Sequence, residues 1–242
     1  MPEGNHSTFT EEMKQGVYQA IHTRRDIRAQ FKPDPIPGEV LVRILEAAHH
    51  APSVGFMQPW NFIVIEDARM KEAVKGSFLK AHEASAELFD ESKRAAYRSF
   101  KLEGIVESPV NLCVTCDRSR FGPVVIGRTT QREMDLYSSV CAIQNLWLAA
   151  RSEGVGVGWV SILYPKDLRE IFHLPPEVVP VAYLCLGYVT HFPERPELET
   201  AGWLPRLSLK EVLFSEEWGN RTGRLHEILE RQKRNQPSKE EF

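Results

Sequence analysis

The stretch that decides the expected fold is residues 134–161, MDLYSSVCAIQNLWLAARSEGVGVGWVS. Its first part, Met134–Glu153, is rich in Ala, Leu and Trp and is apolar around most of its circumference. This pattern predicts a helix buried on several sides. Gly154 follows at the position where helices commonly end in a left-handed conformation. Gly156–Ile162 then has the apolar character of a strand.

The glycines in this stretch resemble a dinucleotide-binding loop, but their context differs. Gly154-Val-Gly-Val-Gly158 follows a helix and opens a strand, whereas the dinucleotide fingerprint follows a strand and opens a helix. The sequence therefore argues against a dinucleotide-binding fold. Instead, we expect Gly158-Trp-Val-Ser161 to form a strand edge against a flat ligand, with the Ser161 hydroxyl pointing at it.

Helices cluster along the rest of the chain instead of alternating strictly with strands, which favours an α+β fold over a doubly wound sheet. Turn residues and apolar spacing set the expected elements. We expect helices over 10–24 (capped by Thr10), 38–50 and 166–172, mostly helical structure over 68–103, and strands over 61–66, 109–116 and 179–189.

Composition is that of a soluble enzyme, with 42% hydrophobic and 26% charged residues. The length of 242 residues suits one sizeable core or two small ones. A net charge of −3 gives no reason to expect nucleic-acid binding. No apolar run approaches the roughly 18–20 residues of a membrane span, and the N-terminus lacks a secretory signal. We therefore expect a cytoplasmic protein without membrane partners.

Charge patterning suggests a division of the chain into three parts. We expect a flexible N-terminus over 1–9, one domain over 10–219 and a charged C-terminal tail over 220–242. Within the domain, the stretch 68–103 is strongly charged, which favours a mobile cover over a core element. Residues 80–104 are the expected lid.

The cysteines and histidines give no metal-binding pattern. Cys113 and Cys116 lie three positions apart in an expected strand, so their thiols should point to opposite faces. We therefore interpret them as core residues and not as a metal site or a disulfide. His49 and His50 are adjacent and face different directions on a helix. No metal is predicted.

Three arginines follow the first helix within five residues: Arg24, Arg25 and Arg28. Such a group suits phosphate recognition, but cations at a helix C-terminus also stabilise the helix, and the residues alone support both interpretations. Asp26 lies among these arginines. Their charges should keep its carboxylate ionised, which would make it a proton acceptor.

The loop Pro52-Ser-Val-Gly-Phe-Met-Gln-Pro-Trp60 is a second candidate binding segment. Gly55 would allow close approach of the backbone to a planar ligand, and Ser53 and Gln58 could bond to ring heteroatoms. Considered by itself, the loop is better explained as an ordinary helix–strand connection.

Together these segments resemble the FMN-dependent nitroreductase superfamily. The resemblance rests on Arg24-Arg-x-x-Arg28 after a helix, on Ala51-Pro-Ser with Gln58-Pro-Trp60, and on Glu153–Trp159 after a long buried helix. Arg206 in Leu204-Pro-Arg-Leu-Ser-Leu209 fits that family's C-terminal phosphate contact. The resemblance implies a central, mostly antiparallel sheet flanked by helices, and a homodimer with FMN sites shared between two chains.

One branch of that superfamily is matched more densely, from about residue 10 to Gly219. The resemblance to this branch also includes Lys101-Leu-Glu-Gly104, Cys113–Arg118 and Met134-Asp-Leu-Tyr137. In that branch FMN is a substrate: reduced FMN reacts with O2, and its dimethylated ring leaves as 5,6-dimethylbenzimidazole, the lower ligand of vitamin B12. Asp26 is the informative difference from ordinary nitroreductases, which commonly carry serine there.

The resemblance implies a role for each candidate residue. Arg24, Arg28 and Arg206 would hold the phosphate, while Arg25 and the 52–55 backbone would shape the ring pocket. Asp26 would move protons, and Ser161 would donate a hydrogen bond near the reacting ring edge. The full set of expected FMN contacts is Arg24, Arg25, Asp26, Ile27, Arg28, Pro52, Ser53, Gly55, Gln58, Ser161 and Arg206.

Other functions remain compatible with the same segments. One is an NAD(P)H-dependent nitroreductase, flavin reductase or corrinoid reductase, and another is a non-catalytic flavin-binding protein. The destructive reaction would need a separate flavin reductase as partner, and NAD(P)H would act only through that reductase.

Overall fold

The computed structural model describes residues 8–235, so the predictions for 1–7 and 236–242 lie outside the described residues. The chain forms two compact units, Met1–Glu194 and Arg195–Phe242. The first unit contains the sheet and all the predicted site residues except Arg206. The predicted domain end at Gly219 stays a prediction.

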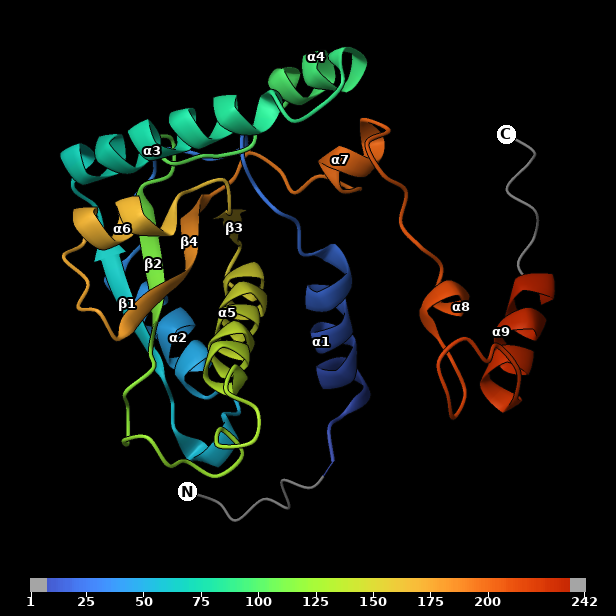
Figure 1. Ribbon diagram of the computed structural model, residues 1–242. Helices are drawn as coiled ribbons and strands as arrows, with labels where there is room; N and C mark the ends of the chain where they lie inside the picture. The colour runs from blue at the N-terminus through green and yellow to red at the C-terminus, as the bar shows by residue number, and fades with distance from the viewer. Residues whose placement is uncertain (1–7, 236–242) are drawn as a thin grey trace. The chain divides into compact units, whose positions relative to one another are not determined.

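A four-stranded antiparallel sheet forms the centre of the described part of the first unit (Figure 1). The order β1-β2-β4-β3 makes β1 and β3 the edge strands. The α+β fold and the antiparallel sheet are thereby confirmed. The strands begin and end within two residues of the predicted positions: β1 Trp60–Ile65, β2 Val110–Asp117, β3 Val155–Val160 and β4 Val178–Tyr188.

Helices cover both faces of the sheet. On one face, Ile44 and Ile143 pack against Leu112, and on the other, Phe78 and Leu168 pack against Cys113. Side chains alternate across a strand, so neighbouring residues of β2 serve different cores. The helices are α1 Glu11–Thr23, α2 Gly38–His49, α3 Ala68–Ala86, α4 Glu91–Ser99, α5 Met134–Ser152 and α6 Pro165–Ile171, with the short turn η1 Val54–Phe56.

Local signals explain where two of the helices begin and end. The Thr10 hydroxyl accepts a hydrogen bond from the Met13 N–H at 3.3 Å, which confirms it as the cap of α1. Gly154 has φ +74°, so it ends α5 in the left-handed region as expected.

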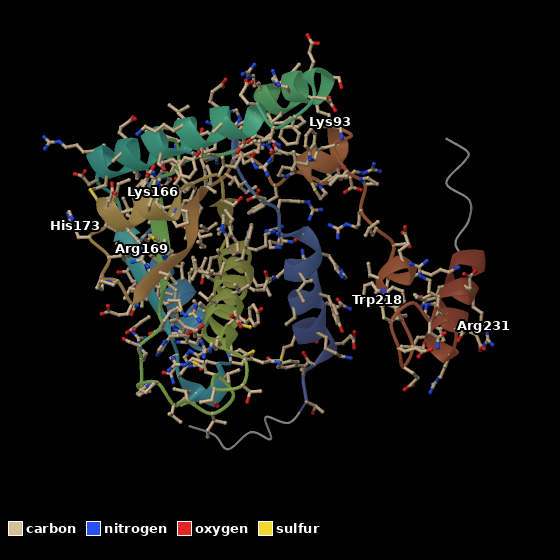
Figure 2. All side chains as sticks on the ribbon, viewed as in Figure 1. Lys93, Lys166, Arg169, His173, Trp218 and Arg231 are labelled. Atoms are coloured by element: carbon tan, nitrogen blue, oxygen red, sulfur yellow. The ribbon has the colours of Figure 1, made fainter. Side chains whose placement is uncertain are left out.

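The expectation that 68–103 is a cover and not a core element is wrong for α3. Val74 and Phe78 on this helix are buried in the second core cluster. The sequence argument weighed the charges and overlooked the apolar side of the helix. α4 carries the exposed, charged part of the stretch, including Lys93 (Figure 2).

The cysteine interpretation is confirmed. Cys113 belongs to the cluster with Phe78, while the Cys116 thiol interacts with Ser139 of α5 on the other side of the sheet. Burial raises the pKa of Cys116 to about 11, which keeps it a neutral thiol.

The second unit contains α7 Glu197–Thr200, α8 Leu209–Val212 and α9 Arg224–Asn235. Ser208 and Glu211 form a capping box at α8. Trp218 is 90% exposed (Figure 2). Across the described residues of the whole chain, no helix has the length and apolarity needed to span a membrane.

Candidate functional site

The arginine segment, Arg24–Arg28, follows α1 and runs beside the outer edge of β3. Asp26 bridges to Val157 in parallel orientation, and the Ile27 N–H donates to the Val157 carbonyl at 3.0 Å. On α5, the Trp147 indole N–H donates to the Arg25 carbonyl at 3.2 Å. The segment is therefore fixed by the edge strand on one side and by the buried helix on the other.

Two glycines of β3 make room for this segment. A Cβ on Gly158 would lie 2.0 Å from the Ile27 carbonyl oxygen, and one on Gly156 would lie 2.9 Å from an Ile27 side-chain carbon. The absence of side chains at Gly156 and Gly158 thus lets Ile27 of the same chain approach β3 closely. The sequence analysis expected the edge at Gly158 to lie against a flat ligand, but the backbone of Ile27 already occupies that position.

Gly158→Ala should lower the free energy of unfolding by about 3 kcal/mol, since the new Cβ would meet a backbone oxygen that cannot rotate away. Gly16→Ala on α1 is the matched control, because a Cβ there meets nothing within 4 Å. It should stabilise the protein by about 0.5–1 kcal/mol. Urea unfolding measures both changes, and equal effects would contradict the close packing at Gly158.

Asp26 is held on both carboxylate oxygens. Oδ1 accepts the Trp159 N–H at 2.8 Å, while Oδ2 accepts from Arg28 Nη2 at 2.7 Å and Nε at 3.1 Å. The side chain is still 31% exposed, so one side of it can reach a ligand. The edge strand and Arg28 thus orient the Asp26 carboxylate in the middle of the arginine segment.

Burial raises the pKa of Asp26 above its ordinary value, and the Arg28 charge and the Trp159 N–H only partly oppose this. The sequence argument counted the arginine charges, which act downward, and missed desolvation, which is larger. A carboxylate with a raised pKa is a stronger base. The role of Asp26 as a proton acceptor stays a prediction.

The other two arginines also have partners in the fold. The Arg24 guanidinium lies 4.8 Å from the centroid of the Trp147 ring. Arg25 donates to the carbonyls of His22 at 2.8 Å, Arg24 at 2.7 Å and Glu194. Among the described residues, the buried Arg25 Nε has no hydrogen-bond partner.

Ser161 follows the last residue of β3 and is exposed. It lies two residues beyond Trp159, whose N–H binds Asp26, a separation of roughly 7 Å along an extended chain. The two predicted catalytic residues are therefore in one neighbourhood. Figure 1 shows β3 close to the path of the chain that follows α1.

The 52–58 loop is held together by hydrogen bonds between its own residues. The Ser53 hydroxyl accepts the Gln58 N–H at 3.1 Å, and the Gln58 side-chain amide donates to the Phe56 carbonyl at 2.8 Å. Gly55 has φ +59°, and a Cβ there would lie 2.6 Å from Val125 Cγ1. The close approach expected between Gly55 and a ligand is here made with the protein's own loop.

Sequence reasoning missed Arg120, which clamps this loop. Its guanidinium donates to the carbonyls of Gln58 at 2.5 Å and Trp60 at 3.1 Å, and to the Asn61 side chain at 2.5 Å. No motif marks this arginine, because its partners lie about sixty residues away in sequence and come near only through the pairing of β1 with β2.

Within one chain the two candidate segments lie at opposite ends of the sheet. Asp26 pairs with Val157 of β3, which is level with Val110 of β2 across the sheet. The 52–58 loop leads into β1 at Trp60, which pairs with Cys116 of β2. Six residues along β2 correspond to about 20 Å, and β1 and β3 are three strand spacings apart, about 14 Å. Figure 1 shows the loop before β1 and the chain that follows α1 at opposite ends of the sheet.

This separation means that Arg25 and the 52–55 backbone of one chain cannot line the same ring. Arg206 is exposed in the second unit, in a segment without helix or strand. Its phosphate contact stays a prediction.

The segment 103–109 anchors the expected lid to the arginine segment. A Cβ on Gly104 would lie 2.7 Å from the Arg28 carbonyl oxygen. Glu103 is 2% exposed and binds Lys75, Lys101 and the Ile105 N–H. The base of the lid is therefore held by close packing and hydrogen bonds, and its closing over a ligand stays a prediction.

Comparison with known proteins agrees with this fold. The Nitroreductase family matches residues 21–188, and the chain belongs to that family. A crystal structure of iodotyrosine deiodinase bound to FMN and 3-iodo-L-tyrosine superimposes with a TM-score of 0.65 at 21% identity, covering 83% of this chain and 98% of that one. Proteins of this family bind FMN.

Two similar proteins have a more specific name. The chain is 39% identical over 198 residues to the 5,6-dimethylbenzimidazole synthase of Rhodospirillum rubrum, covering 82% of this chain and 93% of that protein. It is 33% identical over 199 residues to the protein of the same name from Rhodobacter capsulatus, covering 82% and 96%. The family and the branch inferred from the sequence motifs are thereby confirmed.

Proposed function

We propose that this protein fragments reduced FMN with O2 and releases 5,6-dimethylbenzimidazole. The observation that carries the proposal is Asp26, a carboxylate of raised pKa fixed within an arginine segment. A group of this kind suits repeated proton transfer. The similarity to two proteins named 5,6-dimethylbenzimidazole synthase supports the same conclusion.

The donor set of the arginine segment fits FMN. Arg24 and Arg28 supply guanidinium groups for a phosphate, and Arg206 is proposed to join them. The buried Arg25 Nε has no partner among the described residues and can donate to a ligand atom. FMN, when bound, supplies the ring that reacts with O2 once it is reduced.

The residues of this chain bind, orient and move protons in the proposed reaction. Asp26 accepts and returns protons, with Trp159 N–H and Arg28 holding its two oxygens. Ser161 donates a hydrogen bond near the reacting edge of the ring. The 80–104 region is proposed to exclude water, and Gly104 couples its base to Arg28.

A second copy of the chain would complete the site. Because one chain holds its arginine segment and its 52–58 loop at opposite ends of the sheet, the loop must come from a partner to meet the same FMN. Exposed apolar side chains on α1, namely Met13, Val17, Tyr18 and Ile21, offer a surface for such an interface. We therefore propose a homodimer with two shared sites.

The competing function is an NAD(P)H-dependent reductase, which the family name itself favours. One experiment separates the two: protein, FMN, NAD(P)H and air are combined with and without a separate flavin reductase. The proposal requires 5,6-dimethylbenzimidazole and loss of flavin absorbance only when the reductase is present. NAD(P)H oxidation by the protein alone would support the reductase, and FMN binding without turnover would support a flavin-binding protein.

The proposed base role predicts a pH profile. Product formation should fall at low pH as Asp26 becomes protonated, which gives the pH profile an acid limb. Because the pKa of Asp26 is raised, the midpoint of this limb should lie above roughly 3.9, the pKa of an ordinary aspartate. Arg28 lowers that pKa, so Arg28→Gln should move the limb to higher pH. The measurement is benzimidazole yield against pH at saturating reduced FMN. A limb that stays in place or moves downward would exclude Asp26 as the titrating base.

Ser161→Ala removes only the hydroxyl and should slow benzimidazole formation or divert the reaction to hydrogen peroxide. Ser161→Thr keeps a hydroxyl and should restore part of the yield. Both products are quantified in single-turnover reactions. An unchanged yield in Ser161→Ala would remove Ser161 from the mechanism.

A further inference from the structure

A cavity of about 420 Å³ lies in the loop that joins β2 to α5. Within one chain it is distant from Arg24–Arg28. The loop begins after Asp117 of β2, and Asp117 lies seven residues along that strand from Val110, which is level with Asp26 across the sheet. That corresponds to about 24 Å. The lining residues are Arg118, Pro123, Arg128, Thr129, Arg132 and Asp135.

The cavity has an excess of positive charge. Asp135 is 1% exposed, and among the described lining residues it is the one carboxylate. It accepts Arg118 Nε at 3.1 Å and lies 3.9 Å from Arg128 Nη1, while its other oxygen accepts the Leu136 N–H at 2.8 Å. The described lining holds one carboxylate and three guanidinium groups, so two positive charges are left over.

Two arginines of the lining, Arg118 and Arg128, are held in place by the fold. Arg128 is 7% exposed, and its guanidinium donates to the carbonyls of Arg118 at 3.1 Å and Gly122. Arg118 Nη2 in turn donates to the Arg132 carbonyl at 2.6 Å. These contacts orient the positive charges before any ligand arrives, which reduces the entropy lost on binding.

Arg132 and Thr129 supply donors that the protein does not use. Both residues are exposed, and within the described part of the chain no hydrogen bond or ion pair engages the Arg132 guanidinium or the Thr129 hydroxyl. A guanidinium fork and a hydroxyl beside fixed positive charges match the oxygens of a phosphate group.

We propose that this arginine pocket binds the dianionic phosphate of a phosphate monoester, as a second anion site distinct from Arg24 and Arg28. Two surplus positive charges balance a dianion. The pocket shares a segment with the 52–58 loop, because Val125 and Ile126 pack on Gly55. The site does not depend on the chemistry proposed for FMN.

The test is a calorimetric titration of inorganic phosphate into protein saturated with oxidised FMN, which occupies the FMN site proposed at the arginine segment and is not consumed without a reductant. We expect one phosphate per chain. Arg132→Gln should weaken binding by about tenfold or more, since a charge-assisted hydrogen bond is lost. Arg69→Gln, an exposed arginine on α3, is the matched control and should leave binding unchanged.

A second variant separates this pocket from the proposed FMN site. Arg28→Gln should weaken FMN binding but leave the phosphate titration intact. The proposal is overturned if Arg132→Gln and Arg69→Gln bind phosphate equally, if no phosphate binds to the FMN-loaded protein, or if Arg28→Gln abolishes phosphate binding. The first two outcomes would leave the proposed FMN reaction untouched.

Discussion

Asp26→Asn is expected to leave FMN bound while lowering benzimidazole formation about 10²–10⁴-fold, the usual contribution of a general base. The amide oxygen can still accept the Trp159 N–H, so the segment should stay on β3. The amide cannot accept a proton at neutral pH. The measurements are FMN affinity and product yield under saturating reduced FMN.

Asp34→Asn is the matched control, because Asp34 is an exposed aspartate outside the site. It should keep the normal yield. Near-normal product from Asp26→Asn would show that the proton acceptor is another group, even if FMN fragmentation itself is real. Loss of FMN binding would show that Asp26 mainly orders the arginine segment.

Mixing two inactive variants should restore activity if each flavin site draws on two chains. Gly55→Val should disable the 52–58 loop, because Gly55 has φ +59° and its Cβ would lie 2.6 Å from Val125 Cγ1. In a hybrid with Asp26→Asn, one site carries both defects and the other carries neither. Random exchange in an equal mixture should then give about a quarter of the wild-type activity.

The control for this experiment is each variant mixed with itself, which should stay inactive. Circular dichroism of Gly55→Val shows whether the fold survives the substitution. A mixture no more active than its components would mean that one chain builds the whole site, contrary to the separation of the two segments across the sheet.

Periodicity in the sequence predicted most elements of the first unit. The strands and the helices α1, α2, α5 and α6 occupy their expected positions because each buries an apolar side whose spacing is visible in the chain. α3 was misjudged because its surface charges are numerous, while its contacts through Val74 and Phe78 depend on the sheet beneath.

Residue chemistry in the sequence also marked Arg24–Arg28 as a candidate site, but it did not show how the fold builds that site. Arg24, Asp26 and Arg28 lie within five residues, so their joint presence needs no tertiary structure. The sequence did not predict the contacts of Arg120 or the arginine pocket, because the residues that form them come together only when the loop between β2 and α5 has folded.

The residues 134–161 by themselves determined the helix, its stop at Gly154 and the strand that follows, since these depend on local backbone preference and on apolar patterning. Only the tertiary structure decided what the glycines of that strand accommodate, in which direction the pKa of Asp26 moves and which segments one chain can bring together. Close approach, desolvation and strand register all arise from contacts between residues distant in sequence, and local patterns do not encode them.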